Sequence, residues 1–386
     1  MTAEVLIMNR HGVAIAADSA VTRYIYGYPK ITNTANKLFR LSKKAPVGIL
    51  IYNNSRINDI PFELLVKDFR TEHLNDDFNE LSEYAESFLN YLGGSKINTK
   101  EMELKYVETA VRFMFSEINR TLQQHFQDKD IVDRLVIINE IKAILEERLF
   151  SIKESSLYDN VDENLMAKIH KEYGDFVSKV SAENKLMDGQ VIELLKAICL
   201  ESLYRDVGLL PNSGVVVTGF GKNNYFPSYF HYSLFGVLCG QALYKEIKCP
   251  KIDHSNFAHI APFAQRDVVD SFITGINKKM EKSIHEKILP SEQQNVMRII
   301  QEEKDKNIDE IIQIVGDLSI SDLAQMAKSL VEITSFKRKV SSDAGTVGGP
   351  IDVAVISKGD GFVWVERKHY FKKELNEFFF QGYLER

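Results

Sequence analysis

Three residues near the start of the chain have the chemistry of a nucleophilic site. Thr2 follows Met1, which is normally removed when the next residue is as small as threonine, so we expect a mature chain that begins with Thr2. Its α-amine, with a pKa of about 8, can act as the base that activates its own hydroxyl. Lys37 supplies a cation that lowers the pKa of this hydroxyl, and Asp18 supplies a carboxylate that holds the cation in place.

The position of these residues depends on four expected strands at the start of the chain. Alternating and β-branched residues predict strands over 4–9, 12–18, 37–42 and 47–53. Asp18 ends the second strand and Lys37 begins the third, so adjacent strands would bring both charges beside the first residue of strand one. The alternative is that both side chains are solvated at strand ends, as such residues usually are.

The rest of the chain alternates between helical and strand patterns. Apolar spacing predicts helices over most of 57–206, then strands at 214–220 and 225–234 and a helix that contains Val268, Phe272, Ile276 and Met280. Further helices follow; Ser291 with Gln294, and Ser319 with Asp322, are the expected N-terminal caps. A hairpin of 347–356 and 362–366 ends the pattern, and the order predicts an α+β fold without a clear domain boundary.

Composition and motifs exclude several classes of protein. A net charge of −6 argues against a nucleic-acid surface, and no apolar run approaches the roughly 20 residues that cross a bilayer. The N-terminus lacks the pattern of a signal peptide, so we expect a cytoplasmic protein. The three cysteines, without CxxC spacing, and the absence of HExxH, GxSxG and a phosphate loop predict no metal, no cofactor and no serine nucleophile elbow.

Several segments, in their order along the chain, resemble proteasome β-type subunits. HGVAIAADSAVT (11–22) is similar to the N-terminal hairpin of that family, and NKLFRLS (36–42) to the segment with its catalytic lysine. VGILIYNN (47–54) resembles its fourth strand. SISDLAQMAKSLVEI (319–333) and SSDAGTVGGPIDVAVI (341–356) resemble its last long helix, the loop after it and the next strand, and VGGPID is most similar to the bacterial Anbu branch.

The resemblance, over roughly residues 2–72 and 186–366, implies an N-terminal nucleophile hydrolase with a four-layer αββα sandwich. Such a threonine peptidase attacks a polypeptide carbonyl through Thr2, while Asp18 orients Lys37. It implies further that Thr22 pairs its backbone with an extended substrate, that the backbone N–H of Asn53 forms the oxyanion hole, and that Asp343 supports the terminal amine. Relatives form rings and receive substrate from separate ATPases, so a homo-oligomer and an ATPase unfoldase are the implied partners.

The chain departs from the family pattern in two motifs and in its length. Asn53 stands where the family usually has glycine, and IAPFAQRD (260–267) replaces a supporting serine loop. We interpret residues 1–386 as one hydrolase domain with helical insertions at 73–185 and 286–318. The main insertion is either a cover over hydrophobic surface or a lid or docking surface over the entrance to the site. The departures leave two further alternatives to a peptidase: a catalytically inactive scaffold, and a small-molecule amidohydrolase that uses the same site.

Overall fold

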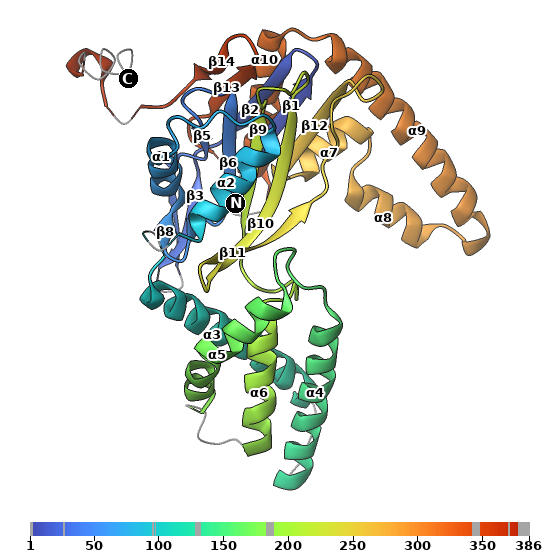
Figure 1. The fold of residues 1–386 in the computed structure, drawn as a ribbon. Helices are drawn as coiled ribbons and strands as arrows, with labels where there is room; N and C mark the ends of the chain where they lie inside the picture. Colours follow the sequence, from blue (N-terminus) through green and yellow to red (C-terminus); the bar gives the residue numbers. More distant parts are fainter. Residues whose placement is uncertain are drawn as a thin grey trace.

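Two five-stranded antiparallel sheets lie face to face at the centre of the molecule (Figure 1). The computed structural model describes residues 3–25, 28–94, 96, 98–127, 133–182, 189–341, 348–369 and 371–376. In strand order, the first sheet consists of β12 (Ala258–Ala264), β1 (Ala3–Asn9), β2 (Gly12–Ala17), β13 (Asp352–Ser357) and β14 (Gly361–Glu366). The second consists of β11 (Gln241–Ile247), β10 (Ser228–Leu238), β9 (Ser213–Gly219), β6 (Val47–Asn53) and β5 (Leu38–Arg40).

Strand β1 is buried on both faces, and its alternate side chains enter different cores. Ala3, Val5 and Ile7 belong to a cluster with the helices outside the first sheet. Leu6 and Met8 belong to the cluster between the two sheets. Since side chains alternate along a strand, Glu4 shares the inner face with Leu6 and Met8.

Helices cover the outer face of each sheet and complete a four-layer αββα sandwich. The helices that pack on the first sheet are α7 (Asp267–Thr274), α9 (Pro290–Asp317) and α10 (Ile320–Val340). The helices that pack on the second sheet are α1 (Phe62–Glu72) and α2 (Leu81–Leu92). This architecture confirms the α+β, αββα prediction. Among the described helices, none is long and apolar enough to cross a membrane.

Four helices form an arm at one end of the second sheet, drawn below β11 in Figure 1. They are α3 (Lys100–Phe126), α4 (Arg134–Glu154), α5 (Glu163–Ala182) and α6 (Gly189–Ser202). The arm has its own apolar core, which Leu238 of β10 and Leu243 of β11 join to the sheet. A second projection consists of α9 and the shorter α8 (Lys278–Lys287) (Figure 1).

Local signals predicted most strands but not every boundary. A hairpin of β3 (Val21–Ile25) and β4 (Tyr28–Thr32) lies between β2 and β5, where no strands were expected, and a short pair, β7 (Arg56–Ile57) and β8 (Ile60–Pro61), precedes α1. The single helix expected from Val268 to Met280 is two helices, because Gly275 adopts a left-handed φ of 72° and ends α7.

Two capping predictions had different outcomes. Ser319 accepts a hydrogen bond from the Asp322 backbone N–H and caps α10 as expected. The cap expected at Ser291 is wrong, because Leu289 is the N-cap of α9 and Pro290 occupies its first turn. Proline fits that position since the first N–H groups of a helix have no internal partner.

Candidate active site

A buried ion pair lies at the N-terminal end of β1. Lys37 Nζ is 2.6 Å from Asp18 Oδ1, and the exposed fractions of the two side chains are 5% and 0%. The solvated alternative for these residues is therefore wrong. Removing one partner of a buried pair leaves an unpaired charge, which typically costs about 3–5 kcal/mol of stability. We therefore expect the stability of the fold to depend on both residues.

Backbone N–H groups fix the Asp18 carboxylate in one orientation. Its Oδ1 accepts a hydrogen bond from the Ala3 N–H at 3.0 Å, in addition to the bond from Lys37. Its Oδ2 accepts from the N–H groups of Ala20, at 3.2 Å, and Gly348, at 2.9 Å. One carboxylate thus connects β1, the chain after β2, the chain before β5 and the segment before β13.

Strand pairing brings these groups together from distant parts of the sequence. Glu4 pairs with Ala17 in the antiparallel ladder of β1 and β2, and the Asp18 N–H donates to the Ala3 carbonyl at 3.1 Å. Lys37 directly precedes β5, where its carbonyl accepts from the Ile51 N–H at 2.9 Å. The ion pair therefore joins the first sheet to the second.

Glu4 is a second acid at this place, and it has no hydrogen-bond partner among the described residues. It is only 1% exposed, and within the described part of the chain neither carboxyl oxygen has a partner. Burial raises the pKa of Glu4 well above its usual range, the Lys37 charge opposes this shift, and the Asp18 charge adds to it. The sequence analysis did not select Glu4, although it is the one charge in the buried run AEVLIMN.

The half-buried Tyr52 and the buried His231 form a neighbouring pair from the second sheet. Tyr52 Oη and His231 Nε2 are 2.5 Å apart, and both rings pack against Phe263 of β12. Burial, together with the charge of Arg266, lowers the pKa of His231 to about 4. Burial and then the charge of Glu4 raise the pKa of Tyr52. The space between the sheets therefore contains titratable groups as well as apolar ones.

A cavity of about 190 Å³ opens beside Lys37. Its lining includes Lys37, Ala35, Ile51 and Phe62. At the rim, Glu63 accepts hydrogen bonds from Asn36 Nδ2 at 3.0 Å and Lys67 Nζ at 2.6 Å. Polar residues outnumber apolar ones in the lining, so a side chain that enters this cavity would meet mixed surroundings.

The remaining predicted site residues have the following positions. Asn53 also lines the cavity, has a left-handed φ of 63°, and donates from Nδ2 to Asn212 Oδ1 at 3.2 Å. Thr22 pairs with Ile31 in the β3–β4 hairpin, and its buried hydroxyl has no partner in the described part of the chain. Thr2 and Asp343 lie outside the described residues.

The segment predicted as a loop at 260–267 is mostly strand. Ala258–Ala264 forms β12 at the edge of the first sheet, where Ala264 is opposite Ala3. Only Gln265 and Arg266 connect β12 to α7, and Ala264 has a left-handed φ of 61°. Because the end of β12 is opposite the start of β1, Gln265 and Arg266, which follow β12, are the residues nearest in register to the start of β1. Neither is a serine.

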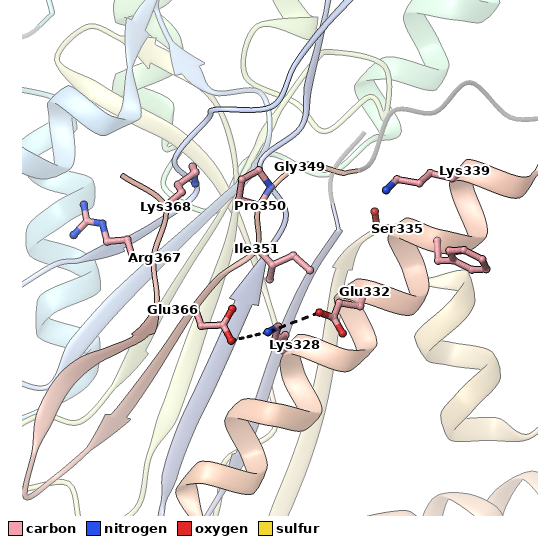
Figure 2. Close-up of a pocket in the computed structure, with 11 residues that line it drawn as sticks. Lys328, Glu332, Ser335, Lys339, Gly349, Pro350, Ile351, Glu366, Arg367 and Lys368 are labelled. Atoms are coloured by element: carbon pink, nitrogen blue, oxygen red, sulfur yellow. Dashed lines mark hydrogen bonds and ion pairs between the residues drawn. The ribbon is translucent and has the colours of Figure 1, made fainter. Parts of the chain in front are cut away.

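A larger hollow of about 720 Å³ lies beside the C-terminal half of α10 (Figure 2). Figure 2 shows Lys328 between Glu332 and Glu366, with Nζ–Oε1 distances of 3.9 and 2.6 Å. The lining of this hollow includes Gly349 and Pro350 but neither Asp18 nor Lys37. We therefore assign the candidate site to the smaller cavity. Within the described ranges, no cluster of three or more His, Cys, Asp or Glu residues is arranged to hold a metal.

No protein-family model matches the chain, and a search of curated proteins finds no match. Among solved structures it is similar to a Gly-1 mutant of Anbu from Hyphomicrobium sp. strain MC1, with 10% identity and a TM-score of 0.32, over 100% of this chain and 96% of that one. It is also similar to Anbu, an ancestral beta-subunit, from Yersinia bercovieri, with 11% identity and a TM-score of 0.27, over 99% and 95%.

Proposed function

We propose that this protein is an N-terminal threonine hydrolase that cleaves amide bonds in polypeptides. One observation supports this most directly: Asp18 Oδ1 binds both Lys37 Nζ and the N–H of Ala3, the residue that follows Thr2. A buried cation and its carboxylate are therefore attached to the backbone immediately after the proposed nucleophile. This arrangement supplies the charges that activation of a threonine hydroxyl needs.

In the proposed reaction, Thr2 Oγ attacks the substrate carbonyl and its proton passes to the Thr2 α-amine. The tetrahedral intermediate collapses, the amine returns the proton to the leaving nitrogen, and an ester remains on Thr2. Water then attacks the ester and releases the acid. Lys37 stabilises the developing alkoxide, Asp18 holds Lys37 in place, and Asp343 supports the amine.

Substrate binding is assigned to the groups around the cavity. The backbone N–H of Asn53 stabilises the oxyanion, a contribution typically worth about 10²–10³ in rate. The edge of the β3–β4 hairpin at Thr22 pairs with the extended substrate as an added strand. The substrate side chain next to the cleaved bond occupies the cavity that Ile51 helps to line.

Beyond the site, the proposal includes the arrangement of the whole chain. Residues 1–386 act as one domain in the cytoplasm, as a homo-oligomer that receives substrate from a separate ATPase. The insertions 73–185 and 286–318 act as surfaces for docking or as a lid. Deletion of 100–185, the part of the larger insertion that leaves α2 of the sandwich in place, then raises peptide turnover or abolishes assembly, whereas a folded deletion variant unchanged in both contradicts this assignment.

One observation favours a second candidate, a catalytically inactive scaffold of the same fold. Gln265 and Arg266 follow β12 where a supporting serine would be expected. In that case Met1 is retained or Thr2 is acetylated. A small-molecule amidohydrolase would use the same nucleophile and differ only in the substrate that the cavity accepts.

The intact mass of the full-length protein, before and after incubation with a peptide epoxyketone, tests the proposal. This electrophile requires both the hydroxyl and the free amine of an N-terminal threonine. We expect loss of Met1 and one adduct per chain, abolished in Thr2→Ala and retained in the control Thr109→Ala, in which an exposed arm threonine is changed. Retained Met1, or an adduct that persists in Thr2→Ala, would overturn the proposal.

A further inference from the structure

The two carboxyl oxygens of Glu4 are the unusual feature of the inter-sheet core. They are buried and lack a hydrogen-bond partner among the described residues. Most buried polar groups in proteins are satisfied, since an unsatisfied one forfeits its hydration without compensation. A residue that breaks this rule is more often retained for function than for stability.

The neighbours of Glu4 place it between two sets of polar side chains. In the first sheet it is opposite Ala17 of β2 and Phe263 of β12. The charged groups that act on it are Asp18, after β2, and Lys37, before β5. From the second sheet its charge acts on Tyr52 of β6, which is bonded to His231 of β10. Glu4 thus faces the Asp18–Lys37 pair from the core side.

The position of Glu4 in the chain links it to the N-terminus. Glu4 is two positions after Thr2, the start of the proposed mature chain, and the intervening Ala3 is held by Asp18. A charge on Glu4 therefore appears inside the fold, close to the reacting groups, where solvent does not screen it. At an effective dielectric constant of about 20, a unit charge roughly 8 Å away changes an equilibrium or a rate by more than tenfold.

We propose that Glu4 is a positioning residue that sets the charge state in which the threonine site works. As an uncharged acid, Glu4 leaves the Asp18–Lys37 pair with zero net charge beside Thr2. When Glu4 loses its proton to solvent hydroxide, the buried group becomes −1. That charge opposes the alkoxide of Thr2 and the oxyanion of the intermediate, so the rate falls. This role rests on the proposed threonine chemistry.

The pH dependence of adduct formation tests this role. We would measure the rate of epoxyketone addition from pH 6 to pH 10 for wild type, Glu4→Gln and the control Glu103→Gln, which alters a buried acid of the arm. Glutamine keeps the shape of the neutral acid but cannot ionise. The ratio of the Glu4→Gln rate to the wild-type rate is expected to rise by at least about tenfold toward alkaline pH. The ratio for Glu103→Gln stays constant. Parallel profiles for Glu4→Gln and wild type would overturn the role.

Unfolding measurements separate a failure of this inference from a failure of the proposed function. Because the pKa of Glu4 is raised in the folded state, its contribution to stability is complete at acid pH and is lost as pH rises through the folded value. The Tm difference between Glu4→Gln and wild type should therefore grow with pH. In the Lys37→Met background this difference should be larger, because an ionised Glu4 then faces Asp18 without the cation.

A wild-type protein that forms no adduct at any pH would reject the hydrolase, and the unfolding data would still decide on the coupling of Glu4 to Lys37. A Tm difference that is independent of pH, or equal with and without Lys37, would overturn the coupling and with it the proposed role of Glu4. Neither result requires a catalytically active protein.

Discussion

Two buried glutamates, Glu4 between the sheets and Glu103 in the helical arm, have opposite surroundings. Glu103 is 5% exposed, and its Oε1 accepts from Asn98 Nδ2 at 2.5 Å and from the Gly240 N–H at 3.2 Å. Its Oε2 accepts from the hydroxyl of Tyr173 and lies 3.8 Å from Lys100 Nζ. The carboxylate thus ties α3 and α5 to the β10–β11 turn.

Glu4 has no hydrogen-bond partner among the residues that the structure describes, yet it is more deeply buried than Glu103. The two charges that act on it, Asp18 and Lys37, are bound to each other, and Asp18 also accepts hydrogen bonds from backbone N–H groups. The difference teaches that burial alone does not define the role of an acid. An acid with a structural role is recognised by the hydrogen-bond donors around its carboxylate. An acid without such donors beside an ion pair affects that pair through its charge state.

The largest expected effect is the loss of stability when the lysine near each buried glutamate is replaced. Lys37→Met leaves the Asp18 carboxylate buried without a cation, so we expect a loss of about 3–5 kcal/mol in the free energy of unfolding. Lys100→Met should cost less than about 1 kcal/mol, since its side chain is 48% exposed. Urea denaturation at pH 7 measures both; equal losses would contradict the contrast between the two regions.

Replacing each acid with leucine should have opposite signs. Glu103→Leu leaves the donors of Asn98, Tyr173 and Gly240 unsatisfied and should destabilise by about 3 kcal/mol. Glu4→Leu removes an unsatisfied buried group and should stabilise by about 1 kcal/mol at pH 8.

Thermal unfolding of the two leucine variants beside wild type gives the sign directly. Glu4→Gln and Glu103→Gln, which keep an acceptor, are the matched controls for side-chain volume. Destabilisation by Glu4→Leu as large as that by Glu103→Leu would show that Glu4 is a structural acid.

A histidine–tyrosine bond occurs in each region and gives a pH-dependent contrast. The pKa of His231 is lowered to about 4 from an ordinary 6.5, so its contribution to stability is present above pH 6.5 and is lost as pH falls toward 4. Wild type should lose about 2 kcal/mol more than His231→Gln between pH 7 and pH 5.

The control for this measurement is His170→Gln, which changes an exposed histidine bonded to the hydroxyl of Tyr204 at 3.0 Å. Denaturation curves at a series of pH values provide the comparison. If stability falls with pH equally in wild type and His231→Gln, the pKa of His231 is not lowered in the folded state.

The smallest effect on stability is expected from substitutions of Asn53, whose backbone N–H belongs to the proposed site. No residue of the arm has a matching role in the proposal. Asn53 has a left-handed φ, which asparagine tolerates, and its side chain is held by Asn212. Asn53→Gly should therefore change stability by less than about 0.5 kcal/mol, while Asn53→Ala costs about 1 kcal/mol.

The same variants examine the oxyanion hole. Because the backbone N–H remains, Asn53→Gly should keep the rate of adduct formation within about threefold of wild type, far from the 10²–10³ expected if a donor is lost. A much faster Asn53→Gly would show instead that the asparagine side chain crowds the hole.

Short-range patterns in the sequence were sufficient for much of the fold. The alternation in 4–9 and 12–18 predicted β1 and β2, and the Ser319 cap predicted the start of α10. These signals involve residues a few positions apart, so the chain reports them locally. The β3–β4 hairpin was missed because it lacks a clear alternation, and Gly275 was not recognised as the end of a helix.

For the site, the sequence by itself determined the residue types: a threonine behind Met1, an aspartate after β2 and a lysine before β5. Only the tertiary structure decided that Asp18 and Lys37 are buried together against Ala3, because their distance depends on pairing between two sheets. It alone decided that Glu4 has no hydrogen-bond partner in the described ranges and that Tyr52 lies against His231. Whether a buried polar group is satisfied depends on the whole shell around it, and that shell is assembled from segments far apart in the chain.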